Sequence, residues 1–289
     1  MSEMKPLSWQ AFNEVYQASV RRVLEHWTTQ MQWEIASHCR GWSPDRFDFR
    51  DYLEASSVRF YRAYRAFTKA GDPPSICDVG GFWGVFPVTL RELGYDVTMT
   101  ESLQYYGGSF NPLFDYIRER GVTILDYDPF QPEARLIARF DVVTVMAVLE
   151  HYPHSLKPFM ENVVSLLPPG GRLYLEVPNI AYWPKRIELL RGQTPQTPLA
   201  DIFHSETPFI GHHHEFTLAE LRELVASSGL SVISEDTYNY TPGSLPALKR
   251  VLRSPLQFLA FSLLKDSREC LAILCRREVT EHSQMNRPS

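Results

Sequence analysis

The sequence predicts an α/β fold in which a doubly wound, mostly parallel sheet carries helices on both faces and is preceded by a helical extension. Between residues 76 and 177, short apolar runs alternate with segments of helical periodicity, a pattern typical of βαβ units. The apolar run at 76–79 enters a glycine-containing turn, 80–84, that opens a helix, as ligand loops of such folds do. Hydrophobic residues make up 44% of the 289 residues, enough to bury a large core.

The N-terminal segment is expected to form two helices, over residues 9–37 and about 49–70. Glycine and proline at residues 41–44 separate them, because both residues end helices. The second helix places four apolar side chains along one stripe: Leu53, Phe60, Tyr64 and Phe67. One face of that helix should therefore be buried. Three arginines lie off the stripe, Arg59, Arg62 and Arg65, and a solvated face is a more ordinary interpretation of them than contact with a substrate.

Five short apolar strands are expected in the alternating region, at residues 76–79, 97–99, 122–125, 141–147 and 173–177. Helices are expected between them, after Gly84, around 112–119 and at 156–167. Right-handed crossovers would bring the carboxyl ends of these strands to one rim of the sheet. Residues that follow the strands are therefore the candidates for a binding site.

Two further strands are expected at 230–234 and 270–275, the first preceded by a helix that begins with the capping box at 217–220. Between them, residues 248–264 place Lys249, Arg250 and Arg253 ahead of the apolar run 258–261. This segment could cover the core, lie at a dimer interface or lie on a membrane surface. The first two roles are favoured, because the segment is short and contains a proline.

The chain is interpreted as one main domain with additions, since α/β chains of this length commonly are. We expect an N-terminal helical lid or extension at 1–71, the main domain at 72–278 and a flexible tail at 279–289. Within the main domain, the connection from about 178 to 216 is long and contains a helical pattern at 183–190. Long ordered connections at a strand rim are usually functional, so this insertion should face the substrate.

Charge and cysteine content limit the possible binding partners and the expected cellular location of the protein. A net charge of -5 disfavours nucleic acid recognised through its phosphates. Four cysteines show no paired framework and are expected to be reduced. The sequence begins without a signal-peptide pattern, and no run reaches the roughly 20 apolar residues of a transmembrane helix. We therefore expect a cytoplasmic protein with a small-molecule or saccharide substrate, and homo-oligomer formation is left open.

The glycine loop narrows the class of ligand. It does not match G-x-G-x-x-G, because Phe82 stands at the second glycine position, and no G-K-[ST] follows. A loop that grips phosphate is therefore disfavoured. Four acidic residues lie at or after the ends of the first three strands: Asp78, Glu101, Asp126 and Asp128. Such clustered negative charge favours a nucleoside that lacks phosphate and carries positive charge.

With these motifs in this order, the sequence resembles the class I S-adenosylmethionine (SAM)-dependent methyltransferases over about residues 74–278. The matching segments are the loop 78–84, the acids Glu101 and Asp126, and residues 140–143, 148–151 and 169–173. The resemblance implies a Rossmann-like sheet of seven strands and N-terminal helices that act as a lid over the cofactor. Phe82 is a departure, because it replaces a glycine usual in the family.

The resemblance also implies a set of cofactor-binding residues. Asp78, Gly80, Gly81 and Gly84 would surround the amino-acid and ribose parts of SAM, and Glu101 would bind the ribose hydroxyls. Asp126 would bind the adenine amine, with Ser102 and either Tyr127 or Leu125 beside the ring. Ser102 stands where the family often has an apolar residue. For Asp126 and Asp128, capping of the loop is the alternative.

The reaction implied by the resemblance is an in-line displacement on the sulfonium methyl group, and a hydroxyl nucleophile needs a nearby base for it. His151 is the first candidate, because it follows the fourth strand; the alternative is that Glu150 and His151 only shape the site. The second group of candidates is His212, His213 and His214, one of which is expected to face the substrate.

No metal site is predicted. Neighbouring histidines in an extended segment point to opposite faces, and the sequence lacks zinc-type Cys/His spacing. Mg²⁺ held by Asp and Glu side chains, as in some sugar methyltransferases, is compatible with the sequence but is not indicated by its spacing.

The expected function is SAM-dependent O-methylation of a hydroxyl on a sugar, an oligosaccharide or polysaccharide, or another small hydroxylated metabolite. Residues 177–183, 189–192 and 211–217 are similar to methyltransferases that act on such compounds. Two alternatives stay open. One is an N-methyltransferase or a lipid or quinone methyltransferase with the same core, and the other is a non-catalytic binding protein, to which the altered residue Phe82 points.

Overall fold

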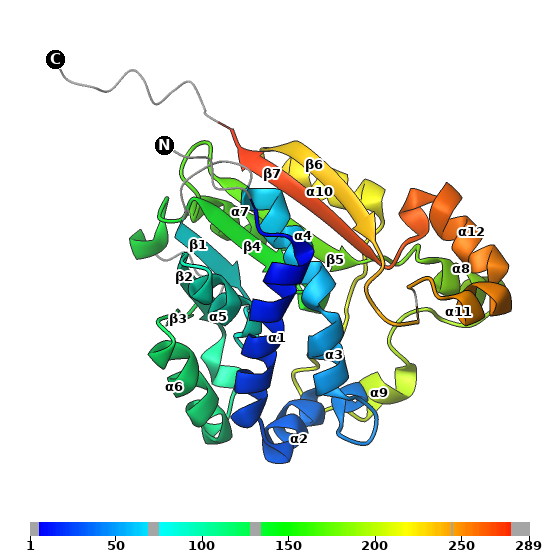
Figure 1. Ribbon diagram of the computed structural model, residues 1–289, viewed down its shortest axis with the longest axis horizontal. Helices are drawn as coiled ribbons and strands as arrows, with labels where there is room; N and C mark the ends of the chain where they lie inside the picture. The colour runs from blue at the N-terminus through cyan, green and yellow to red at the C-terminus, as the bar shows by residue number, and fades with distance from the viewer. Residues whose placement is uncertain (1–5, 69–74, 128–133, 244, 279–289) are drawn as a thin grey trace.

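The computed structural model describes residues 6–68, 75–127, 134–243 and 245–278, which contain a seven-stranded sheet with helices on both faces (Figure 1). The strand order is β3-β2-β1-β4-β5-β7-β6, and neighbouring strands are parallel except where β7 is involved. The predicted fold class is therefore confirmed. The strands are β1 (Ser75–Val79), β2 (Asp96–Glu101), β3 (Thr123–Asp126), β4 (Val142–Met146), β5 (Arg172–Pro178), β6 (Leu230–Tyr238) and β7 (Cys270–Arg277).

Alternate residues of the strands fill two separate cores, one on each face of the sheet. Ile76, Val97 and Val142 pack with helices α1, α4, α5 and α6, whereas Cys77, Val143 and Leu173 pack with α7 and α10. This is the two-residue periodicity of a sheet covered on both faces. The helices of these layers are α1 (Trp9–Glu25), α4 (Ser57–Phe67), α5 (Val85–Glu92), α6 (Asn111–Glu119), α7 (Leu156–Ser165) and α10 (Leu218–Ser227).

Each of the two predicted N-terminal helices is divided in the structure. The first becomes α1 and α2 (Thr29–His38), because the side chain of Thr28 caps the new helix by accepting from the backbone N–H of Met31. The second becomes α3 (Phe49–Ala55), capped by Asp48, and α4. A capping residue inside a continuous helical periodicity thus marks the first break, whereas α4 begins after Ser56 without a side-chain cap.

The prediction of a solvated face for Arg59 is wrong. Arg59 is buried, and its Nε and Nη2 donate to Glu176 Oε2 of β5 at 2.9 and 2.7 Å. The other two arginines are partly exposed or exposed, and Arg62 forms an ion pair with Asp236 of β6. The apolar stripe is confirmed, since Leu53, Tyr64 and Phe67 are buried and Phe60 packs on the same core.

The remaining helices lie after β5 and between β6 and β7: α8 (Trp183–Leu190), α9 (Leu199–Phe203), α11 (Leu248–Arg253) and α12 (Pro255–Leu263). The predicted helix at 183–190 is confirmed, while α9 was not expected. Strand β6 continues to Tyr238, beyond the predicted end, because its polar residues keep pairing with β7 at the sheet edge. The predicted tail at 279–289 lies outside the described residues, and the division of the chain into lid and main domain stays a prediction.

Candidate cofactor pocket and catalytic residues

A cavity of about 290 Å³ lies at the carboxyl ends of β1, β2 and β4. Its floor includes Gly80 after β1, Glu101 at the end of β2 and Val148 after β4. One wall comes from the N-terminal helices and another from the 178–216 segment, and the lining residues there are Ile35, His38, Trp42, Pro208, Phe209 and Ile210. The cavity therefore occupies the rim at which open α/β sheets bind their ligands.

The loop after β1 depends on glycines at two positions. Gly80 has φ +67°, and a side-chain Cβ there would lie 2.6 Å from Val148 Cγ2. Gly84 has φ +69°, and a Cβ there would lie 2.4 Å from Ile117 Cδ1. Only glycine combines left-handed backbone with such close neighbours. The backbone N–H of Gly80 donates to Thr100 O at 2.9 Å, which holds the loop against β2.

Asp78 supports this loop from within the sheet and is not among the residues that line the cavity. Its Oδ1 accepts from Thr144 Oγ1 of β4 at 2.5 Å, and burial raises the pKa of its carboxyl group to about 7. A Cβ on Gly81 would lie 3.0 Å from Asp78 Oδ2. Asp78 thus lies directly beneath the backbone of the loop.

Glu101 brings a buried carboxyl group into the cavity. Its Oε2 accepts from the Tyr106 hydroxyl at 2.9 Å, while its Oε1 is buried and finds no hydrogen-bond partner in the described part of the chain. Burial raises the pKa of Glu101 to about 7, against the opposing effects of the Tyr106 hydroxyl and of the backbone N–H of Phe82. A buried carboxylate oxygen without a partner is costly, so Glu101 Oε1 is set up to accept a hydrogen bond from a ligand.

The predicted adenine contacts lie in different places. Ser102 and Tyr127 line the cavity. Asp126 is exposed and lies outside that lining, and its Oδ1 accepts from the backbone N–H of Leu103 at 3.0 Å. This contact is the loop capping that the sequence left open for Asp126. Asp128 lies outside the described residues.

His151 lines the cavity at the end of the short 3₁₀ helix Leu149–His151. Its Nδ1 lies 2.7 Å from the carbonyl oxygen of Ile210. Since a carbonyl oxygen can only accept, Nδ1 carries the proton and Nε2 is left with a free lone pair. Burial, and next the neighbouring His212, lower the pKa of His151 to about 3. The ring is therefore neutral near pH 7.

Of the three adjacent candidate histidines, His212 makes a ring contact with His151, with 4.8 Å between their ring centroids. Its Nδ1 lies 2.9 Å from Glu215 Oε1. His213 is exposed with its Nε2 3.0 Å from Phe209 O, and His214 is exposed beside Glu220. None of these three histidines is among the residues that line the cavity.

Among the residues that the structure describes, Glu150, His151 and His212 form a group that could hold a metal ion. One ligand atom from each lies within 4.8 Å of the others. Glu150 Oε2 is buried without a hydrogen-bond partner among the described residues, and burial raises the pKa of its carboxyl group to about 7. Ligand atoms that share a cation at about 2.1 Å are about 3 Å apart, so these side chains would have to approach one another to bind one.

Comparison with known protein families gives a match over residues 49–235 to the family described as a methyltransferase domain. The chain belongs to the methyltransferase domain family. The resemblance to class I SAM-dependent methyltransferases is thereby confirmed, and with it SAM as the cofactor. Comparison with curated protein sequences gives no match.

Three solved structures share the fold of this methyltransferase. One is a chain of the complex between the Haloferax volcanii Trm112 methyltransferase activator and the putative methyltransferase, with 16% identity, TM-score 0.52 and coverage of 80% of this chain and 95% of that chain. Another is N-methyltransferase NodS from Bradyrhizobium japonicum WM9 in complex with S-adenosyl-l-homocysteine, with 13% identity, TM-score 0.51 and coverage of 86% and 99%. The third is a putative sarcosine dimethylglycine methyltransferase from Galdieria sulphuraria, with 11% identity, TM-score 0.51 and coverage of 80% and 91%.

Sequence reasoning did not single out the individual residues that form the walls of the methyltransferase's cavity. Trp42 packs edge-on against His151, with 5.7 Å between ring centroids, and Ile210 orients His151 through its carbonyl oxygen. Both lie far from His151 in the sequence. A contact made by a backbone carbonyl cannot be predicted from residue type, because every residue has one. The aromatic residues after Glu101 carried a signal, since Tyr105 and Tyr106 follow a strand end, and both line the cavity.

Proposed function

We propose that this methyltransferase transfers the methyl group of SAM to a hydroxyl of a sugar, an oligosaccharide or polysaccharide, or another small hydroxylated metabolite, with His151 as the general base. The observation that carries the proposal is the hydrogen bond between His151 Nδ1 and the Ile210 carbonyl. It leaves Nε2 unprotonated on a ring that lines the same cavity as Glu101, whose Oε1 has no hydrogen-bond partner among the described residues.

SAM supplies an electrophilic methyl group on a sulfonium sulfur. Glu101 Oε1 would accept from the ribose hydroxyls, since this buried oxygen has no other partner among the described residues. The backbone of Gly80 allows close approach of the ligand, and the ionised carboxylate of Glu101 places negative charge in the cavity that would receive the cationic sulfonium. Tyr127, Phe82 and Tyr105 offer apolar and aromatic surface in the cavity for the adenine ring.

His151 would take the proton of the acceptor hydroxyl on Nε2 as the new carbon–oxygen bond forms. The resulting imidazolium keeps its Nδ1–H bond to Ile210 O, which strengthens when the donor is charged. The backbone carbonyl groups of Ile210 and Gly211 favour the charged ring and offset part of the burial that makes the free ring a weak base. Trp42 and Ile35 of the N-terminal helices cover the cavity and limit water access.

Support for a sugar-like acceptor comes from the mouth of the cavity. Tyr105 is 47% exposed and presents its ring to solvent while it lines the cavity. Aromatic rings beside polar groups such as His38 and His151 suit a ligand that has an apolar face and several hydroxyls. A cavity lined in this way favours a hydroxylated acceptor over a fully apolar one.

The test is methyl transfer from SAM to a panel of monosaccharides, oligosaccharides, other hydroxylated metabolites and amines, with wild type and His151→Ala. Turnover on a hydroxyl acceptor should fall by about 10²–10⁴-fold in His151→Ala, with SAM affinity nearly unchanged. His204→Ala, an exposed histidine away from the cavity, is the matched control. Transfer to amines alone, or full turnover in His151→Ala, would contradict the proposal.

The cluster of Glu150, His151 and His212 favours a second candidate, in which a divalent metal ion activates the acceptor hydroxyl by lowering its pKa. The two candidates differ in the role of His212. If His151 is a base, His212→Ala should retain most of the turnover and a chelator should have little effect. If the cluster holds a metal, His212→Ala should lose as much turnover as His151→Ala, and the chelator should abolish activity.

A further inference from the structure

Three helices on the carboxyl-rim side of the sheet form a separate projection, which we call the leucine lobe: α8, α11 and α12. Figure 1 shows them grouped at the right of the molecule. Helix α12 packs against both α8 and α11, and the rings of Tyr182 and Phe261 stack at 5.7 Å between centroids inside the lobe. The lobe joins the sheet through the ends of β5, β6 and β7, and its other face is open.

The open face of the lobe is apolar. Helix α12 contains no charged residue, and Leu256, Leu259 and Leu263 are 70%, 53% and 71% exposed. At about 100° per residue, these positions fall within about 60° of one another on the helix. The two helices that contact α12 also expose leucines, Leu252 of α11 and Leu190 of α8, which are 72% and 83% exposed. Covering the core, one of the roles predicted for residues 248–264, therefore explains the buried residues such as Ala260 and Phe261 but not the exposed leucines.

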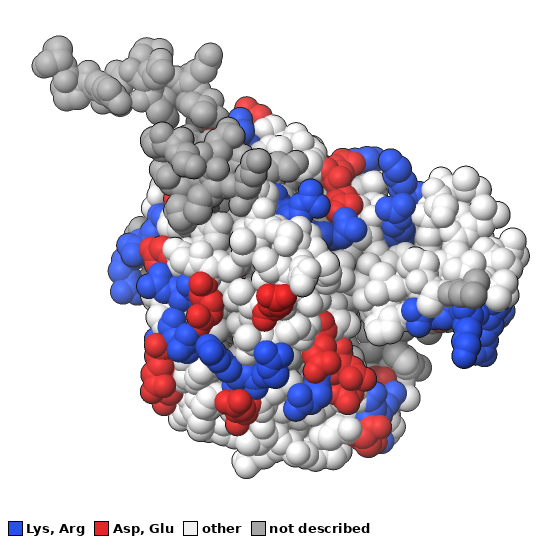
Figure 2. Space-filling view, viewed as in Figure 1, with Lys and Arg blue, Asp and Glu red and all other residues white. Residues whose placement is uncertain are grey.

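Positive charge borders this apolar face. Helix α11 exposes Lys249, Arg250 and Arg253 and has no acidic residue. In the described chain, no carboxylate lies within ion-pair distance of these three side chains. Figure 2 shows the lobe as a largely white surface with blue side chains gathered at its lower edge. The whole chain has a net charge of -5, so this positively charged surface has the opposite sign to the chain as a whole.

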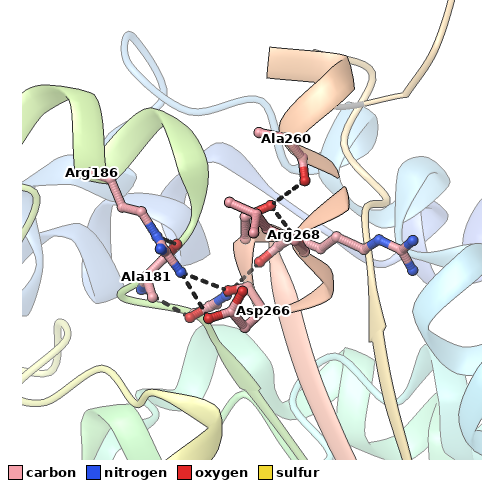
Figure 3. A network of polar contacts seen from close by, with 8 residues as sticks. Ala181, Arg186, Ala260, Asp266 and Arg268 are labelled. Atoms are coloured by element: carbon pink, nitrogen blue, oxygen red, sulfur yellow. Dashed lines mark hydrogen bonds and ion pairs between the residues drawn. The ribbon is translucent and has the colours of Figure 1, made fainter. Parts of the chain in front are cut away.

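A polar network fixes the lobe to the sheet (Figure 3). Arg186 of α8 donates to Asp266 Oδ2 at 3.1 Å, and Asp266 O accepts from Asn179 Nδ2 at 2.7 Å. Arg268 Nε donates to Phe261 O of α12 at 3.1 Å. These bonds join α8, the end of α12 and the start of β7, so the leucines are presented by a fixed scaffold.

We propose that the leucine lobe docks this protein on an anionic lipid bilayer. The leucines would enter the interface between headgroups and acyl chains, while Lys249, Arg250 and Arg253 would lie against lipid phosphates. Charge decides against a second copy of the chain, because two lobes packed through α11 and α12 would leave this basic cluster without an acidic partner, since neither helix contains an acidic residue. In the described residues no helix is long and apolar enough to cross a membrane, so the contact is peripheral.

The test is sedimentation of the full chain with vesicles of phosphatidylcholine alone and of phosphatidylcholine containing phosphatidylglycerol. We expect binding to the anionic vesicles, weakened by salt. Lys249→Glu/Arg250→Glu/Arg253→Glu should reduce partitioning by about fivefold for each positive charge removed, and Leu256→Ser/Leu259→Ser/Leu263→Ser by more than about tenfold. Arg50→Glu/Arg118→Glu/Lys157→Glu changes the net charge equally at exposed positions elsewhere and should retain most of the binding.

Three results would overturn the proposal: no binding to anionic vesicles, equal binding by the control and the lobe variants, or a dimer in sedimentation velocity that the leucine variants dissociate without any vesicle binding. Because all the substituted side chains are exposed, loss of folding is not expected, and circular dichroism checks it for each variant. The proposal does not depend on the role of His151, since vesicle binding is measured without SAM or acceptor.

Discussion

Gly80→Ala changes the cofactor loop at a position with two constraints, a left-handed backbone and a close neighbouring side chain, and the energetic cost of each can be measured separately. The new methyl group would lie 2.6 Å from Val148 Cγ2, whereas non-bonded carbons lie about 3.5–4.0 Å apart, so Val148 must move by about 1 Å. Left-handed backbone costs a residue with a Cβ about 1–2 kcal/mol, and overpacking costs about 1–3 kcal/mol more. The free energy of unfolding should therefore fall by about 2–5 kcal/mol.

Urea denaturation measures this loss against a matched control. Gly229 has φ +67°, and a Cβ there would meet no atom of the described chain within 4 Å, so Gly229→Ala should show only the backbone cost of about 1–2 kcal/mol. Val148→Ala should restore about 1–3 kcal/mol in a double-mutant cycle with Gly80→Ala. Because Val148 lines the cavity, Gly80→Ala should also weaken SAM binding by about tenfold or more. Equal losses in the two glycine variants, with no coupling to Val148, would refute the reasoning.

Three further predictions concern buried charge. Arg59→Met leaves Glu176 buried and unpaired, so the free energy of unfolding measured by urea denaturation should fall by about 3–5 kcal/mol. Arg59→Met/Glu176→Leu should recover most of that loss. Equal losses of stability in the single and the double variant would contradict the pairing. Burial raises the pKa of Glu101 to about 7, and a cationic ligand with hydroxyl donors favours the charged carboxylate. The SAM dissociation constant should therefore rise about tenfold from pH 8 to pH 6 as this group is protonated. Calorimetry on Glu101→Gln should show that this part of the pH dependence is lost. Tyr106→Phe removes the hydroxyl that donates to Glu101 Oε2 and should weaken SAM binding by about three- to tenfold at pH 8, and an unchanged affinity would show that this hydrogen bond does not order Glu101.

The sheet and the cofactor loop follow from local patterns in the sequence. Two-residue alternation and apolar runs locate the strands, and the right-handed crossover rule brings their ends to one rim. For that reason Gly80, Glu101 and His151 could be placed beside one another before any coordinates. Gly80 follows β1, Glu101 ends β2 and His151 lies in the short 3₁₀ helix after β4, and the structure puts all three in one cavity.

What the sequence did not reveal depends on contacts between distant segments. Arg59 looks like a surface residue on the helix, because its partner Glu176 comes 117 residues later. Three adjacent histidines are equivalent in the sequence, and only the turn at 210–214 brings His212 towards His151. The open face of α12 has the same composition as a helix that covers a core, so only its exposure in the fold distinguishes the two.

The central claim is that the cavity at the ends of β1, β2 and β4 binds SAM through Glu101. Calorimetric titration of SAM, and of S-adenosylhomocysteine, into wild type and Glu101→Ala tests it most directly. We predict micromolar binding of both compounds by wild type and a loss of at least about tenfold in Glu101→Ala. Equal binding by the two proteins, or no binding by a folded wild type, would contradict the account.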